Sequence, residues 1–209
     1  MKERWYDYMK VEVDKDILDF LKAVYFGDFS DSMRAASSRA YRDMNRTIRF
    51  NSLHSNIRIY LREKVTVIFE REILLLTSEV VKKQEDFDDW HFNICCAIRK
   101  LYRDNGVALT FGQAQKWVNM TLKYLYILEK NSFEEIFCYL HVPLDNYVLD
   151  IARDVLEIER PKIAWSKWDE YDKEYLLYQK KIREKVKECE PLRWEFRFWL
   201  KAARNVEDY

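Results

Sequence analysis

The chain has 209 residues and a mass of 25.7 kDa, which is enough for one large domain with a sizeable hydrophobic core. Hydrophobic residues make up 48% and charged residues 34%, a balance that excludes intrinsic disorder, and only three Gly and three Pro argue against turn-rich β folds and linker-rich chains. The 36 basic and 36 acidic residues cancel, so the protein is not a polycation, and any nucleic-acid site must be a local patch.

The sequence does not indicate a membrane protein, a secreted protein or a metalloprotein. The first ten residues, MKERWYDYMK, do not resemble a signal peptide, and no apolar run is long enough to span a bilayer. Because no Cys-x-x-Cys occurs and only three His are present, we expect no metal site and no cofactor. We expect a cytoplasmic protein without a membrane partner, in which all four cysteine thiols are reduced.

Four helices are predicted in the first half of the chain, where apolar residues recur at helical spacing. Each stretch is bordered by residues that start or stop helices, such as Gly27, Ser55 and the Asn105-Gly106 pair. The sequence VTVIF at 65–69 favours a strand by composition, but its charged flanks and the unbroken length of the segment predict a helix. The first predicted helix spans about 16–26, and the second begins with a cap at 30 or 31 and ends at about 48. The third and fourth span about 56–83 and 86–103.

Five further helices are predicted at about 110–130, 132–140, 145–159, 165–187 and 191–203. Pro143 interrupts the chain just before Asp145, which stands where a helix cap belongs. The sequence therefore predicts an all-α fold of eight or nine helices in a single domain spanning 1–209. Two lobes, of about 1–104 and 105–209, would place a cleft between them.

The segment 110–124 combines a glycine and a lysine at the start of a predicted helix. Gly112 permits a tight backbone, and the N–H groups of Gln113, Ala114 and Gln115 would be unpaired, as in sites that bind phosphate. Lys116 is expected in the first helical turn, where the positive end of the helix dipole disfavours an ammonium charge. A neutral lysine amine is a nucleophile.

Two motifs resemble those of the helix-hairpin-helix DNA glycosylases. Gly112-Gln-Ala-Gln-Lys116 is similar to the family's hairpin, Leu-Pro-Gly-Val-Gly-x-Lys-Thr-Ala. Val142-Pro-Leu-Asp145-Asn-Tyr-Val148 is similar to the later Val-Pro-Val-Asp-Thr-His-Val motif, and the order of the two motifs agrees. Their separation is nearest to that of the archaeal 8-oxoguanine glycosylase branch.

The resemblance implies an enzyme that flips a damaged or modified base out of double-stranded DNA and excises it, with AP-lyase activity in some members. Lys116 would be the nucleophile and Asp145 the catalytic acid and base. The backbone amides of Gly112, Gln113, Ala114 and Gln115 would hold a DNA phosphate. We expect such an enzyme to act as a monomer.

A stripe of arginines precedes this segment. Arg39, Arg42, Arg46 and Arg49 recur at steps of three and four, so a helix would carry them on one broad face. Guanidinium groups offer paired donors that suit phosphate, and this local excess of charge is where we expect DNA to bind. A solvated surface face is the alternative interpretation.

Two other functions fit parts of the sequence. Arg49-Phe-Asn-Ser-Leu-His54 has the loose Arg-x4-His spacing of the HEPN ribonucleases, which are also all-α. Each motif above also has a purely structural interpretation, as a turn, a cap or a solvated face. A helical module that binds nucleic acid or protein without catalysis is therefore the main alternative, and whether Lys116 and Asp145 point into one cleft distinguishes it from the enzyme.

Overall fold

The structure is a computed structural model that describes residues 14–50, 53–129 and 133–204, and these residues form eight α-helices and no β-strand. An all-α fold is thereby confirmed. The first half contains α1 (Lys15–Phe26), α2 (Ser32–Met44), α3 (Ser55–Leu75) and α4 (Gln84–Arg103). A 3₁₀ turn, Asn45–Thr47, extends α2, and a π-helical turn, Leu76–Val80, extends α3.

The second half contains α5 (Phe111–Leu128), α6 (Asn146–Leu156), α7 (Leu177–Lys185) and α8 (Pro191–Arg204). Local chemistry sets several of these ends. Gly27 and Gly106 adopt positive φ angles of 80° and 77° after α1 and α4, as their sequence positions predict. Asp31 caps α2, and Thr110 with Gln113 forms a capping box at the start of α5.

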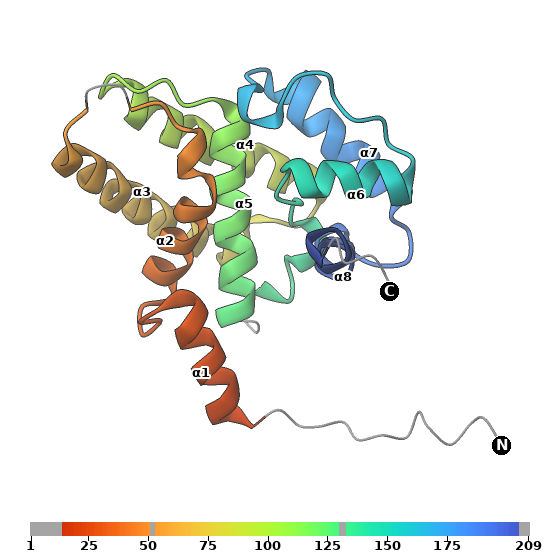
Figure 1. Ribbon diagram of the computed structural model, residues 1–209, viewed down its shortest axis with the longest axis horizontal. Helices are drawn as coiled ribbons and strands as arrows, with labels where there is room; N and C mark the ends of the chain where they lie inside the picture. Colours follow the sequence, from red (N-terminus) through yellow and green to blue (C-terminus); the bar gives the residue numbers. More distant parts are fainter. Residues whose placement is uncertain (1–13, 51–52, 130–132, 205–209) are drawn as a thin grey trace.

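Helix α5 is the central element of the fold (Figure 1). Its first fifteen residues are all buried, although they include glutamines and lysines as well as apolar side chains. Helix α2 packs along it, with the Trp117 ring 4.9 Å from that of Tyr41 and its indole N–H donating to the carbonyl of Ser37 at 3.1 Å. A central helix buried on every side must find partners for each polar side chain, and these partners organise the candidate site.

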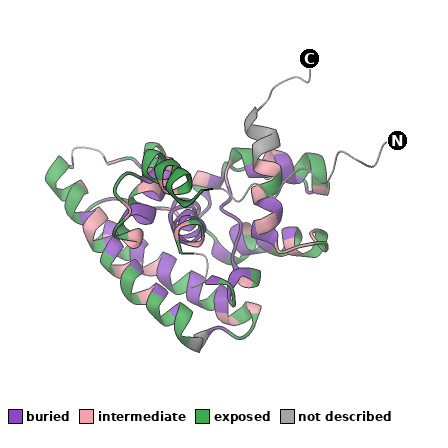
Figure 2. Ribbon diagram, turned by 90° about the horizontal axis from the view of Figure 1, so that it is seen from below, coloured by how far each residue is buried: buried purple, intermediate pink, exposed green. Residues whose placement is uncertain are grey.

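The described buried apolar residues form one cluster that runs from Phe26 to Trp194 and draws on both halves of the chain. Figure 2 shows buried residues on the inner sides of the helices and exposed ones on the outer sides. Helix α1 departs from this pattern, because it projects from the body in Figure 1 and exposes most of its apolar side chains. Among the described residues, no helix is both long enough and apolar enough to span a membrane.

Two predicted helices differ from the structure. The segment predicted at 132–140 forms a short 3₁₀ turn, Phe137–Tyr139, and its predicted cap at Ser132 lies outside the described residues. The helix predicted over 165–187 is divided into a 3₁₀ turn, Trp165–Lys167, a π-helical turn, Tyr171–Leu176, and α7. The physical reason is tertiary: the carbonyl of Trp168 accepts the N–H of Gly112 at 3.0 Å, and that of Ser166 accepts the Thr110 hydroxyl at 2.9 Å.

Candidate functional site

Lys116 and Asp145, which are 29 residues apart in the sequence, meet in the structure. The Lys116 Nζ donates to Oδ2 of Asp145 at 2.6 Å and lies 3.4 Å from the carbonyl of Pro143. The two side chains are 6% and 17% exposed, so the carboxylate remains the more accessible partner. Both residues line the same pocket, which is the arrangement that the enzymatic hypothesis requires.

Helix caps and buried amides hold this pair in place. Asp145 is the N-cap of α6: its Oδ1 accepts the backbone N–H of Val148 at 3.0 Å, which leaves Oδ2 for Lys116. On α5, the Gln115 side chain donates to the carbonyl of Leu144 at 3.0 Å and accepts its N–H at 3.3 Å. One turn later, Asn119 lies 3.4 Å from the carbonyl of Val142. The polar face of α5 therefore fixes the loop that carries Asp145.

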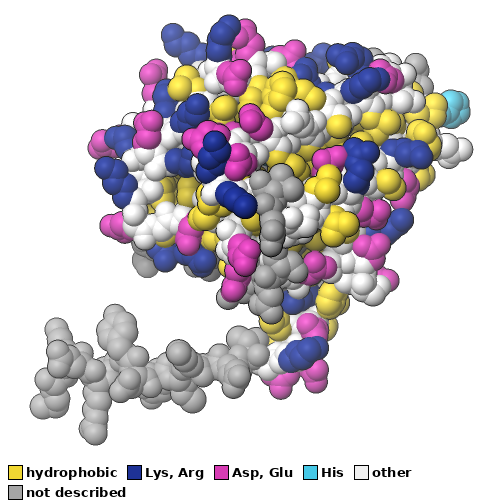
Figure 3. All heavy atoms as spheres, turned by 180° about the vertical axis from the view of Figure 1, so that it is seen from behind, with side chains coloured by type: hydrophobic (Ala, Val, Ile, Leu, Met, Phe, Trp, Pro, Cys, Tyr) yellow, Lys and Arg dark blue, Asp and Glu magenta, His cyan; other side chains and the backbone are white. Residues whose placement is uncertain are grey.

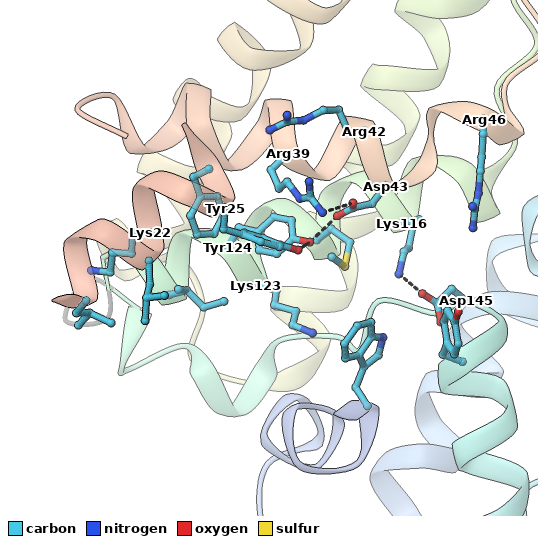
Figure 4. A pocket seen from close by; sticks show the side chains of 17 residues that line it. Lys22, Tyr25, Arg39, Arg42, Asp43, Arg46, Lys116, Lys123, Tyr124 and Asp145 are labelled. Carbon is cyan, nitrogen blue, oxygen red and sulfur yellow. Dashed lines mark hydrogen bonds and ion pairs between the residues drawn. The ribbon is translucent and has the colours of Figure 1, made fainter. Parts of the chain in front are cut away.

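The pocket has a volume of about 640 Å³ and lies between α1, α2, α5, the start of α6 and the second half of α8, which contributes Trp199 (Figure 4). Six basic side chains line it against two acidic ones, so it is a cationic site in a protein of zero net charge. The basic residues are Lys22, Arg39, Arg42, Arg46, Lys116 and Lys123, and the acidic ones are Asp43 and Asp145. On the face shown in Figure 3, by contrast, basic and acidic side chains are interspersed.

A second lysine of α5 enters the same pocket two turns after Lys116. The Lys123 Nζ contacts both carboxylate oxygens of Glu195, at 2.8 and 2.6 Å, and lies 4.6 Å from the centre of the Phe196 ring. Burial lowers the pKa of the Lys123 ammonium, and the Glu195 carboxylate opposes that shift. This pair ties α8 to α5.

Tyrosines and a carboxylate bridge α1, α2 and α5 at the middle of the pocket. The Tyr124 hydroxyl donates to Asp43 and lies 2.9 Å from the hydroxyl of Tyr25. Arg39 lies 3.3 Å from Asp43 and stacks over the Tyr25 ring at 4.1 Å. Burial and the neighbouring Asp43 raise the pKa of Tyr124, which therefore stays protonated as a hydrogen-bond donor.

The prediction that the hairpin amides bind phosphate is wrong for the described structure. Gly112, Gln113, Ala114 and Gln115 are buried, and their donors are occupied. The N–H of Gly112 donates to Trp168, that of Gln113 to the Thr110 hydroxyl at 3.1 Å, and that of Ala114 to the Thr110 carbonyl at 3.0 Å.

Close packing against the 165–168 turn explains why residue 112 is a glycine. A Cβ at Gly112 would lie 1.7 Å from the carbonyl oxygen of Trp165, so only glycine allows the 165–168 turn to approach α5 this closely. The Gln113 and Gln115 side chains are equally committed, to the carbonyl of Thr47 at 2.6 Å and to that of Leu144.

The predicted place of Lys116 in the first helical turn is also wrong. Helix α5 begins at Phe111, so Lys116 is its sixth residue and lies in the second turn. The helix dipole weakens beyond the first turn, and Asp145 is therefore the group that governs the Lys116 amine.

Three of the four predicted arginines reach the pocket. Arg39 and Arg42 project from α2, and Arg46 from the following 3₁₀ turn (Figure 4). Arg49 is exposed and is not among the residues that line the pocket. His54, its partner in the HEPN interpretation, is also exposed and outside the pocket, and residues 51–52 between them lie outside the described range.

The other two histidines belong to the core. The His141 Nε2 lies 2.7 Å from Asp88, and its Nδ1 lies 2.7 Å from the Tyr175 hydroxyl. His91 lies 3.3 Å from the same hydroxyl and 3.0 Å from that of Tyr171. Burial lowers the pKa of His141 to about 4, so this network holds a neutral imidazole at neutral pH.

Sequence reasoning missed the part of the pocket formed by α1 and the far end of α5. Leu18 and Leu21 line it from α1, and Met120, Tyr124 and Ile127 from α5. Their spacing on α5 follows that of Lys116 at steps of four, four and three, so one face of the helix joins them to the lysine. The spacing is visible in the sequence, but the same spacing is typical of apolar residues that pack into a core, so it does not by itself indicate a pocket.

Comparison of this chain with protein-family models, with curated proteins and with solved structures finds no match. The four cysteines are all described and all carry free thiols. Groups of three or more His, Cys, Asp or Glu side chains able to hold a metal ion are absent from the described part of the chain.

Proposed function

We propose that this protein is a DNA glycosylase that excises a damaged or modified base and uses the amine of Lys116 as its nucleophile. The observation that carries the proposal is the 2.6 Å contact between Lys116 and Asp145 inside a cationic pocket. An amine beside a carboxylate supplies a nucleophile together with a group that can accept and return its proton. The resemblance of the two motifs to helix-hairpin-helix glycosylases supports the same roles.

In the proposed reaction, Asp145 accepts a proton from the Lys116 ammonium, and the resulting amine attacks C1′ of the flipped nucleotide. The C1′–N bond to the base breaks, and Asp145 returns the proton to the leaving base. The carboxylate then accepts a proton from the nitrogen bonded to C1′ and transfers it to O4′ as the sugar ring opens. The product is a Schiff base, and loss of a C2′ proton from it would expel the 3′ phosphate.

The substrate in this proposal is double-stranded DNA, held by arginines at the pocket rather than by the hairpin. Arg42 and Arg46 are exposed and line the same pocket as Lys116, so they can pair with the phosphates that flank a flipped nucleotide. We propose that the enzyme acts as a monomer. We propose that the enzyme acts in the cytoplasm, where cysteine thiols such as its four free ones stay reduced.

Borohydride trapping on a duplex with an abasic site tests the proposal. Reduction of a lysine Schiff base gives a covalent protein–DNA adduct, which we expect for the natural chain and not for Lys116→Ala. Lys116→Arg keeps a cation beside Asp145 but cannot form the imine, so it controls for loss of the ion pair. Lys180→Ala removes an exposed basic side chain outside the pocket and is expected to trap normally.

Thermal unfolding of each variant verifies that it is folded before its adduct is measured. An adduct of equal yield with Lys116→Arg would show that another amine reacts, and it would overturn the proposed role. No adduct and no base release with the natural chain would favour the helical binding module.

A further inference from the structure

The pocket has two chemically different ends. At one end lie the Lys116–Asp145 pair and Arg46, and at the other lies α1 with Lys22 (Figure 4). Leu18 and Leu21 of α1 add apolar side chains there, and Ile127 lines the pocket from the last turn of α5. Met120 and the Tyr124 ring continue the apolar surface along α5 between the two ends. A ligand that fills this pocket must therefore present a polar, anionic part to one end and an apolar part to the other.

The apolar end lies far from the proposed nucleophile. Ile127 follows Lys116 by eleven residues on α5, which corresponds to about 16 Å along a helix axis. A purine is built from bonds of roughly 1.3–1.5 Å and, if joined to a sugar at Lys116, would span less than half of that length. A volume of about 640 Å³ likewise suits a larger ligand than one planar base.

The apolar side chains at the α1 end of the pocket are largely exposed to solvent, although they lie next to the buried core. Leu18 and Leu21 are 42% and 54% exposed, and Ile127 is 38% exposed. Exposed apolar side chains that line a concave surface gain free energy when an apolar group covers them. The polar groups of Tyr25, Tyr124 and Asp43 nearby bond to one another, so they do not demand a polar ligand. Lys22 also lines the pocket here, and its methylene chain can cover an apolar group while its ammonium stays in water.

We propose that the substrate is a nucleotide whose base carries a bulky, largely apolar substituent, which occupies the arm formed by Leu18, Leu21, Met120 and Ile127. This inference rests on the proposed function, because it places the sugar at Lys116 and the base between the two ends. The arm selects the substrate by its substituent, and small lesions such as uracil or 8-oxoguanine leave it empty.

Base release from four duplexes tests the inference directly. The target bases are N4-benzylcytosine, glucosylated 5-hydroxymethylcytosine, uracil and 8-oxoguanine, each in the same sequence context under single-turnover conditions. We expect release of the benzyl base at least tenfold faster than release of uracil or 8-oxoguanine. Equal or faster release of a small base would overturn the inference, and preference for the glucosylated base would overturn its apolar character.

Helix α1 offers a matched pair of variants. Leu21 and Val24 are both exposed, but Leu21 lines the pocket and Val24 does not. We expect Leu21→Asp to slow release of the benzyl base at least tenfold, because a carboxylate in the arm would lose hydration when the substituent enters. Val24→Asp carries the same charge change on the same helix and is expected to release the base at the natural rate.

Trapping on an abasic duplex, which has no base to enter the arm, separates the two proposals. If the natural chain forms no adduct there, the glycosylase proposal itself fails. If it forms the adduct but prefers small bases, only the substrate inference fails. If Leu21→Asp reduces abasic trapping as strongly as benzyl-base release, the variant has damaged the pocket in general, and the arm has no selective role.

Discussion

Helix α5 carries two buried lysine–carboxylate pairs that look alike in chemistry and differ in accessibility. Lys116 pairs with Asp145 and Lys123 with Glu195, both at 2.6 Å. The Asp145 side chain is 17% exposed, whereas that of Glu195 is 1% exposed. Asp145 gives one oxygen to the α6 cap and one to lysine, while Glu195 gives both oxygens to its lysine.

This difference separates a pair that can do chemistry from one that holds helices together. A carboxylate with solvent access can exchange protons with a substrate, and its anchoring by a helix cap does not occupy the oxygen that faces the lysine. The Glu195 carboxylate is enclosed and binds its lysine through both oxygens, so it cannot release Lys123 without leaving a buried negative charge unpaired. Under the proposed function, the Lys116 pair would carry out catalysis and the Lys123 pair would hold α8 against α5.

The largest expected effect is on base release when Asp145 is neutralised. Asp145→Asn keeps the size of the side chain but removes the proton acceptor beside Lys116, and we expect single-turnover base release to fall by about 10²–10⁴-fold. Glu195→Gln, the equivalent change in the other pair, serves as the comparison after its folding has been verified. A loss of the same size in both variants would remove the distinction between the pairs.

Loss of stability should not separate the two pairs in this way. Glu195→Ala leaves the buried Lys123 ammonium without its partner, and we expect unfolding free energy to fall by about 3–5 kcal/mol. Asp145→Ala leaves the equally buried Lys116 ammonium without its partner and also removes the α6 cap, so we expect a loss of at least similar size. Urea unfolding followed by circular dichroism measures both. A double variant, Lys123→Met with Glu195→Leu, is expected to recover most of the stability that Glu195→Ala loses. If it does not, the unpaired Lys123 ammonium is not the cause of that loss.

A third buried carboxylate contact, between Asp88 and the neutral imidazole of His141, extends the comparison to the core. Burial lowers the pKa of His141 from 6.5 to about 4, although the adjacent Asp88 opposes the shift. Burial also lowers the pKa of His91, whereas the pKa of Asp88 is held low by His141 and Arg183 against the effect of its burial. Tyr171 and Tyr175, the hydroxyl groups of this network, have raised pKa values and stay neutral.

Between pH 6.5 and 4, the unfolded chain binds a proton at His141 that the folded chain does not bind. Stability is therefore fully present above pH 6.5 and is lost as the pH falls toward 4, by roughly 3 kcal/mol. Urea unfolding as a function of pH measures this slope. His141→Gln should reduce the slope and leave the part that His91 contributes, and an unchanged slope in that variant would assign the acid sensitivity to another group.

The smallest expected effect concerns the arginines on the Lys116 side of the pocket. Charge reversal of Arg42 and Arg46 should weaken binding to duplex DNA by about tenfold at moderate salt and reduce the slope of log K against log[salt] by about 2. Fluorescence anisotropy at several salt concentrations measures both quantities. The exposed pair Lys180 and Lys181 on α7, reversed in the same way, is the control. Equal weakening by the control pair would indicate a diffuse charge effect.

Much of the fold was predictable from local chemistry. The caps at Asp31 and Asp145 and the breaks at Gly27 and Gly106 stand where the sequence predicts them, because a cap or a left-handed turn depends on a few neighbouring residues. The 65–69 segment is helical as expected, within a helix that ends at its π-helical turn, before the predicted residue 83.

The sequence predicted that Lys116 and Asp145 belong to one candidate site, but it did not predict that the hairpin amides are unavailable to a phosphate. The pairing of Lys116 with Asp145 follows the order of two motifs, but the amides at 112–114 looked free because nothing in the sequence shows that the 165–168 turn covers them. The glycine and the lysine of one motif thus serve different purposes. Gly112 permits close packing, and Lys116 faces the pocket.

The sequence by itself determined that this protein is all-α, where most helices begin, and which lysine and aspartate deserve a test, since these depend on periodicity, caps and motif order. Only the tertiary structure decided which of the two α5 lysines faces an accessible carboxylate, and that α1 adds an apolar arm to their pocket. The physical reason is that burial and solvent access depend on contacts between segments far apart in the chain. No local pattern of residues encodes those contacts.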